Sequence, residues 1–237
     1  MIPVLLGAAA LFGAAKTIDA MDDMDRAKRI NREAKEIVDS AKEKFEMFRD
    51  SAQSAIENLG DQKFAILTGS LTDFVDSFSQ IKNVDISETN LSSNELTQMQ
   101  DVVIKVQGTN LSSDDAFATG AFNTRDQTRL YAQKIENTCG ILRGVERRAN
   151  QINRLLGDLD FELTWILGDL EEIIDQSGTN YRNYSPDQRF TVATSAQLAK
   201  TIKIVIDAPL LLSNGSVDGH GTKRVIETGR ALIRKLN

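Results

Sequence analysis

Residues 131–173 read YAQKIENTCGILRGVERRANQINRLLGDLDFELTWILGDLEEI, and their apolar side chains recur in alternating steps of four and three. Such steps place side chains along one face of an α-helix, and a sustained seven-residue repeat is typical of helices that pack lengthwise. The stripe has one polar member, Thr138, and its positions are Tyr131, Ile135, Thr138, Leu142, Val145, Ala149, Ile152, Leu156, Leu159, Leu163, Ile166, Leu170 and Ile173. Gly178 follows as a predicted C-terminal cap. The stretch therefore predicts one long helix, roughly 60 Å in length.

Further apolar residues broaden the face of this helix. They lie beside the stripe, at Leu155, Phe161, Trp165, Leu167 and Ile174. A face wider than a two-stranded seam indicates more than one neighbouring helix. We therefore expect residues 131–173 to lie within a bundle.

A second run with the same spacing occurs near the start of the chain. Eleven of its twelve positions are apolar, and they are Ala20, Met24, Ala27, Asn31, Ala34, Val38, Ala41, Phe45, Phe48, Ala52, Ala55 and Leu59. The many alanines favour close approach of a partner helix, because small side chains bring two backbones together. We expect helix-seam contacts from Val38, Phe45, Phe48, Leu142, Val145, Ile152, Leu156, Leu159, Leu163 and Ile166.

Shorter helices are predicted between and after the two runs. The apolar positions change phase after Gly60, which predicts a kink or turn there. Residues 92–108, SSNELTQMQDVVIKVQG, predict a helix that ends at a glycine. The pentapeptide TNLSS occurs at 89–93 and again at 109–113, each time before acidic residues, as at a helix N-terminus.

Two helices are predicted after the long run. In SPDQRF (185–190), Ser185 is the predicted cap, Pro186 occupies the first turn, and Gln188 completes a capping box. This helix should run to about Ile206. A terminal helix should then face inward through Val225, Gly229, Leu232 and Leu236.

These elements predict an all-α fold. Prolines occur at 3, 186 and 209, so nothing between them interrupts long helices. We expect an elongated helical bundle in which residues 16–59 and 131–177 are long antiparallel coiled-coil-like helices, preceded by an apolar N-terminal helical segment. The predicted segments are the apolar N-terminus (1–15), long amphipathic helices (16–82), acidic short helices and loops (83–123), the long heptad helix (124–178) and a C-terminal helical pair (185–237).

The residues that catalysis or metal binding would need are sparse. The chain has one histidine, His220, and one cysteine, Cys139, which we interpret as a packing residue. No pair with the spacing of a metal site is present. We therefore expect a non-enzymatic protein with no cofactor. The net charge is −6, and residues 61–123 hold nine acidic residues against three basic ones, which argues against a nucleic-acid partner.

The first fifteen residues, MIPVLLGAAALFGAA, contain no charged side chain. Nothing basic precedes them, so a cleaved signal peptide is not predicted. They are apolar on all sides, and a full membrane span needs about 20 such residues. Insertion, shallow interfacial anchoring and burial inside the bundle remain alternatives. We expect membrane contact through residues 2–15, with Val4, Leu5, Leu6, Leu11 and Phe12 facing lipid.

Together these features predict a membrane-associated helical scaffold or protein-interaction module. Its partners would be membrane lipid, a helical protein or a second copy in a homo-oligomer. A single cysteine fits a reducing compartment, so we expect a cytoplasmic protein, peripheral to or anchored in the inner face of a membrane. The alternatives are an α-helical pore-forming or membrane-perturbing protein and a soluble structural bundle.

A hydrophobic segment joined to long amphipathic helices resembles, in general layout, α-helical pore-forming toxins and apolipoprotein-L-like proteins. The pore-forming pattern places its hydrophobic hairpin between long helices. In this chain the apolar segment is N-terminal. The resemblance therefore implies membrane contact more directly than it implies a pore.

Overall fold

The computed structural model describes residues 19–107, 125–211 and 219–236, and it confirms the all-α prediction. Within these ranges the elements follow one another as α1 (Asp19–Thr68), α2 (Ser70–Gln80), α3 (Ile86–Thr89), α4 (Ser93–Gln107), α5 (Arg125–Ser177), a 3-10 turn (Tyr181–Asn183), α6 (Pro186–Asp207) and α7 (Gly219–Leu236). The predicted lipid-facing residues Val4, Leu5, Leu6, Leu11 and Phe12 lie outside the described residues, as does the second TNLSS segment at 109–113.

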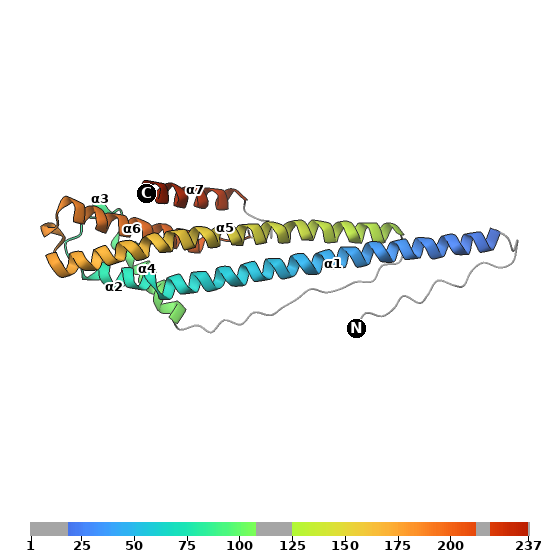
Figure 1. Cartoon of the computed structure of the whole chain (residues 1–237), viewed down its shortest axis with the longest axis horizontal. Helices are drawn as coiled ribbons and strands as arrows, with labels where there is room; N and C mark the ends of the chain where they lie inside the picture. Colours follow the sequence, from blue (N-terminus) through green and yellow to red (C-terminus); the bar gives the residue numbers. More distant parts are fainter. Residues whose placement is uncertain (1–18, 108–124, 212–218, 237) are drawn as a thin grey trace.

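The two long helices, α1 and α5, lie side by side and run in the same direction (Figure 1). Phe48 meets Arg143, and further along both helices Ser70 at the start of α2 donates a hydrogen bond to Asp160. The predicted antiparallel arrangement is therefore wrong. The spacing of an apolar stripe is the same from either end of a helix, so it does not determine whether two packed helices run parallel or antiparallel. The long connection between Thr68 and Arg125, which contains α2, α3 and α4, permits a parallel pair that a short loop would forbid.

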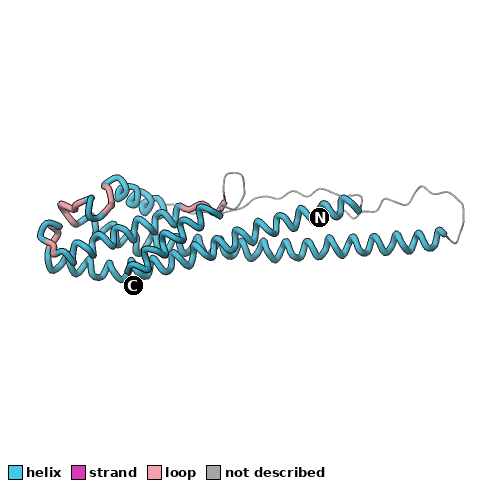
Figure 2. Tube along the Cα trace, turned by 90° about the horizontal axis from the view of Figure 1, so that it is seen from above, coloured by secondary structure: helices cyan, strands magenta, loops and turns pink. Residues whose placement is uncertain are grey.

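The molecule has a thick end and a thin end (Figure 2). We call the thin end the stalk: residues 19–50 of α1 and 125–145 of α5, which extend together beyond the other described helices. We call the rest the head: the remaining parts of α1 and α5 with α2, α3, α4, α6 and α7. The stalk carries α1's N-terminus, so residues 1–18 are joined to the chain at the stalk tip.

The core of the head is built on the α5 stripe. Leu156, Leu159 and Leu163 have no exposed surface, and Val192 and Ile202 of α6 are equally buried. Burial of each such side chain stabilises the fold by about 1.5–3 kcal/mol. The hydrophobic effect therefore holds α1, α2, α6 and α7 around one helix.

Helix α1 continues through Gly60, and the predicted kink there is wrong. The break lies at Gly69, between α1 and α2. Its amide donates to the carbonyl of Ala65 over 2.9 Å, and a Cβ on Gly69 would lie 2.9 Å from that same oxygen. A Cβ on Gly60 would meet no atom within 4 Å. Only tight backbone packing distinguishes the two glycines.

Several predicted helix ends are confirmed. Ser185 and Gln188 form the predicted capping box at the start of α6. Ser92 and Glu95 exchange the equivalent hydrogen bonds before α4. Gly178 ends α5 with a φ of +74°, a conformation that glycine adopts without steric cost.

Phe161 and Trp165 are predicted to widen the packed face of α5, but the structure leaves both side chains exposed. Phe161 is 62% exposed and Trp165 is 68% exposed, although Leu155 and Leu167 beside them are buried. The neighbouring helices cover the seam and its flanks, and they leave the opposite side of α5 open. The expectation that these two aromatic side chains face neighbouring helices of this chain is therefore wrong.

A salt bridge joins α4 to α6. The Lys200 ammonium lies 2.8 Å from a carboxylate oxygen of Glu95 and also donates to the carbonyl of Asn90 over 3.0 Å. The Lys200 ammonium and the amide and hydroxyl groups of Ser92 lower the pKa of Glu95 from 4.5 to about 2. The charged form of this carboxylate is therefore favoured by the fold.

Alanine substitutions should distinguish Gly60, inside α1, from Gly69, at the break between α1 and α2. Gly60→Ala should raise the free energy of unfolding by about 0.5–1 kcal/mol, because it adds a better helix former in open space. Gly69→Ala should lower that free energy by about 1–3 kcal/mol, because its Cβ meets the Ala65 carbonyl. Urea unfolding followed by circular dichroism measures both. Destabilisation by Gly60→Ala would contradict a continuous helix.

Glu95→Gln should destabilise the protein at neutral pH and lose its effect in acid. The folded-state pKa is depressed, so the carboxylate contributes stability above about pH 4.5 and loses that contribution as the pH falls towards 2. The difference in unfolding free energy between wild type and variant should therefore shrink across that window. Glu227→Gln, at a well-exposed carboxylate of α7, is the control and should change stability little at any pH.

Candidate functional site

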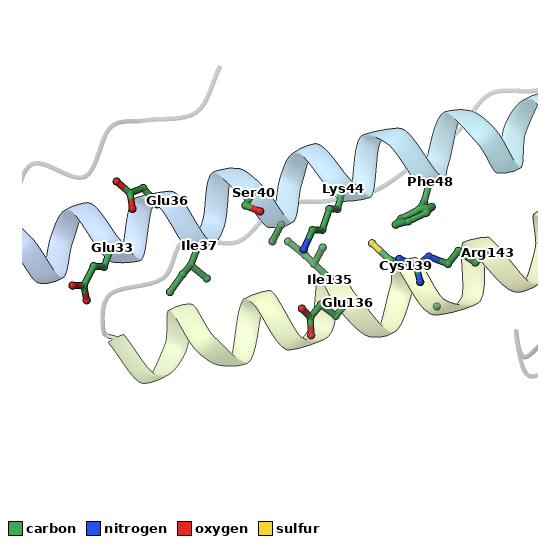
Figure 3. A pocket seen from close by; sticks show the side chains of 12 residues that line it. Glu33, Glu36, Ile37, Ser40, Lys44, Phe48, Ile135, Glu136, Cys139 and Arg143 are labelled. Atoms are coloured by element: carbon green, nitrogen blue, oxygen red, sulfur yellow. The ribbon is translucent and has the colours of Figure 1, made fainter.

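A groove of about 750 Å³ lies between the two helices of the stalk (Figure 3). We call it the stalk groove. The first helix contributes seven of its lining residues and the second contributes five: Glu33, Glu36, Ile37, Ser40, Ala41, Lys44, Phe48, Ile135, Glu136, Cys139, Gly140 and Arg143.

The groove has an apolar centre and charged edges. Ile37 and Ile135 point into the space between the helices, and the Cys139 thiol lies beside the Phe48 ring (Figure 3). The Arg143 guanidinium carbon is 4.0 Å from the centroid of that ring, which is a cation–π contact. Acidic and basic side chains both border this centre. The composition suits an amphipathic helix, which brings an apolar face and charged flanks.

The groove is open because only α1 and α5 form this part of the described structure. Ile37, which lines the groove, is 44% exposed. A pair of helices buries a narrow seam, and broader apolar faces need a third neighbour. Gly140 adds space, because no atom lies within 4 Å of a Cβ placed there. The stalk therefore exposes apolar side chains, whereas further helices cover the equivalent apolar side chains in the head.

The predicted helix-seam residues fall into two groups. In the head, Ile152, Leu156, Leu159 and Leu163 are buried, as is Val145 near the junction with the stalk, and Ile166 is half-buried. In the stalk, Leu142, Val38, Phe45 and Phe48 are half-buried. The structure thus brings Phe48 to the groove and places the leucines in the core.

A second cavity, of about 560 Å³, lies at the far end of the head beside Glu88, Tyr184, Arg189 and Phe190. Its charged groups already have partners in the fold. The Tyr181 hydroxyl donates to Glu88 over 2.6 Å, and the Arg189 guanidinium lies 3.6 Å from the other Glu88 oxygen. Burial, and then the Glu88 carboxylate, raise the pKa of the Tyr181 phenol. This cluster ties α3 to α6 and is best explained as a structural contact.

Sequence reasoning missed most of the groove. Cys139 was interpreted as a packing residue, and its thiol is indeed buried. Ile37 lies next to the stripe position Val38, so its apolar character is the signal that the sequence offers. Whether such flanking residues are covered depends on the number of neighbouring helices, which periodicity does not specify.

Within residues 19–107, 125–211 and 219–236, no helix is long and apolar enough to cross a bilayer. Across the same ranges, no group of three or more His, Cys, Asp or Glu side chains is arranged to hold a metal ion.

The labelling rate of the single cysteine, Cys139, reports how accessible the groove is to a reagent in solution. Cys139 should react slowly with a maleimide in the folded protein, because a buried thiol is inaccessible. Phe48→Ala should raise that rate by about tenfold or more, since it removes the ring beside the thiol. Phe64→Ala, at an exposed phenylalanine of α1 in the head, should leave the rate unchanged. Equal rates in wild type and Phe48→Ala would contradict this packing.

The stalk groove is therefore the described feature best suited to bind a partner, and what it offers is an apolar surface with charged margins. The chain matches no protein-family model, no curated protein and no solved structure.

Proposed function

We propose that the protein is a non-enzymatic helical scaffold that docks a helix of a partner protein in its stalk groove and is held at a membrane by its N-terminal apolar segment. The observation that carries this proposal is the open apolar groove between two otherwise well-formed helices. Binding of a partner helix would supply the third neighbour that α1 and α5 lack in the stalk.

The chemistry of the groove defines the partner helix. Ile37, Ile135 and Phe48 favour leucine, isoleucine or methionine side chains at i, i+3, i+4 and i+7 positions. Glu33 and Glu36 lie towards one end of the groove, Lys44 and Glu136 near its middle, and Arg143 towards the other end (Figure 3). A partner with basic residues near Glu33 and Glu36 and an acidic residue near Arg143 would be complementary in charge.

The proposed membrane anchor is supported by the position of the uncharged N-terminal segment directly before the stalk tip in the sequence. Residues 2–15 are uncharged and are joined to the stalk tip through residues 16–18. An anchor there would hold the stalk, and with it the groove, next to the bilayer. The head would lie on the cytoplasmic side. This arrangement suits a scaffold that collects helical partners at a membrane surface.

Vesicle flotation tests the anchor. The full chain should float with liposomes, and deletion of residues 2–15 should abolish flotation. Leu6→Asp should weaken flotation strongly while leaving helicity unchanged, because a charge in this segment opposes burial in lipid. Leu211→Asp makes the same chemical change at an exposed leucine after α6 and should float like wild type.

Three outcomes of that experiment would overturn the anchor. Equal flotation with and without residues 2–15 would place lipid contact elsewhere. Loss of thermal stability in Leu6→Asp would show that the segment is buried in the fold. Dye leakage on binding would support a pore-forming or membrane-perturbing protein instead of a scaffold.

Protection of Cys139 tests the groove. In membranes from the native cells, a docked helix should slow maleimide labelling of Cys139 relative to the purified chain. Ile37→Asp should remove this protection, because a carboxylate at the groove centre excludes an apolar helix. Unchanged labelling in native membranes would count against docking in the groove.

A further inference from the structure

Helix α5 carries a second regular stripe, on the side opposite its buried seam. Six of its positions are spaced by four and three, and all are exposed: Arg154, Asp158, Phe161, Trp165, Gly168 and Glu172. Each lies two residues, about 200° of rotation, from a seam position. We call these six residues the outer ridge. It is about 27 Å long.

The centre of the outer ridge is aromatic. Phe161 and Trp165 are one turn apart and expose 62% and 68% of their surface. A solvated helix face is normally polar, and large aromatic side chains at the centre of a polar-ended patch are typical of protein interfaces. No described part of the chain covers these two side chains.

Gly168 leaves the turn of α5 after Trp165 without a side chain. A glycine inside a helix costs about 1 kcal/mol relative to alanine. No atom of the described structure lies within 4 Å of a Cβ built on Gly168, so packing inside the chain does not require a glycine there. Gly168 therefore leaves room beside the aromatic pair, and a neighbouring surface is indicated by Phe161, Trp165 and the charges at the ends of the outer ridge.

The charges of the outer ridge identify that surface. Arg154 and Glu172 lie nine residues on either side of position 163, and Phe161 and Trp165 lie two residues on either side of it. Two antiparallel copies of α5 that cross at position 163 would place Arg154 beside Glu172 of the second copy, and Phe161 beside its Trp165. Each pair forms twice, as in any interface with a two-fold axis. A parallel crossing would place like charges together.

We propose that the outer ridge is a self-association surface, through which two copies of this chain form an antiparallel dimer with Phe161 and Trp165 at its centre. The ridge lies in the head and leaves the stalk groove open, so the dimer does not depend on the proposed scaffold function. In the dimer the two stalks point away from each other.

Sedimentation velocity of the full chain tests the proposal. Wild type should be a dimer at micromolar concentration. Trp165→Glu should weaken the dimer on the order of a hundredfold, because it places a carboxylate at an apolar interface centre, and its circular dichroism should match wild type. Phe190→Glu, at an equally exposed aromatic residue of α6, should remain dimeric.

Charge reversal tests the antiparallel geometry. Arg154→Glu should weaken the dimer roughly tenfold, because it sets two acidic groups together at both symmetry-related contacts. Combining Arg154→Glu with Glu172→Arg should restore the wild-type affinity.

Three results would overturn the proposal. These are a wild-type chain that stays monomeric at high micromolar concentration, a Trp165→Glu variant that still dimerises, and a charge-reversed double variant that is not restored. A dimer lost in Ile37→Asp and retained in Trp165→Glu would place self-association in the stalk groove. Flotation and Cys139 protection report on the anchor and the groove, so either can fail while the dimer stands.

Discussion

Leu156, Leu159 and Leu163 lie on successive turns of α5, and the burial of these side chains is the interaction on which the head depends. None of the three has exposed surface, and the other long helix, α2, α6 and α7 all contact the helix that carries them. At Gly229, α7 approaches α5 so closely that a Cβ would lie 2.9 Å from the methyl groups of Leu155. The packing around α5 therefore depends on side-chain size as well as on hydrophobicity.

The same stripe has different surroundings along its length. In the head it meets several helices, and its members are buried. In the stalk, α1 is the one described helix that it meets, so Leu142 and Phe48 are half-buried and a groove remains between the two helices. The open groove is thus a direct consequence of helix length, because α1 and α5 are longer than the helices that cover them. A partner helix would extend to the stalk the cover that the head already has.

Helix α5 also separates two kinds of surface. Its seam is apolar and buried within the chain, whereas its outer ridge is aromatic at the centre, charged at the ends and exposed. The two differ by about 200° of rotation and therefore contact different neighbours. One helix can in this way hold the head together, line the stalk groove and expose the outer ridge.

The amino-acid sequence by itself determined the local elements of the fold. The spacing of apolar residues predicted helices over 131–177, 92–108 and 186 to about 206, which are α5, α4 and α6 of the structure, and Ser185 and Gln188 predicted where the last of them begins. These features depend on contacts between residues three or four positions apart, which sequence order contains.

Three features were decided only by the tertiary structure. They are the parallel course of α1 and α5, the break at Gly69 instead of Gly60, and the exposure of Phe161 and Trp165. A stripe of apolar side chains has no direction, a glycine permits a break without requiring one, and an aromatic residue is buried only where a neighbour covers it. Each outcome depends on where distant parts of the chain come together, which residue spacing does not record.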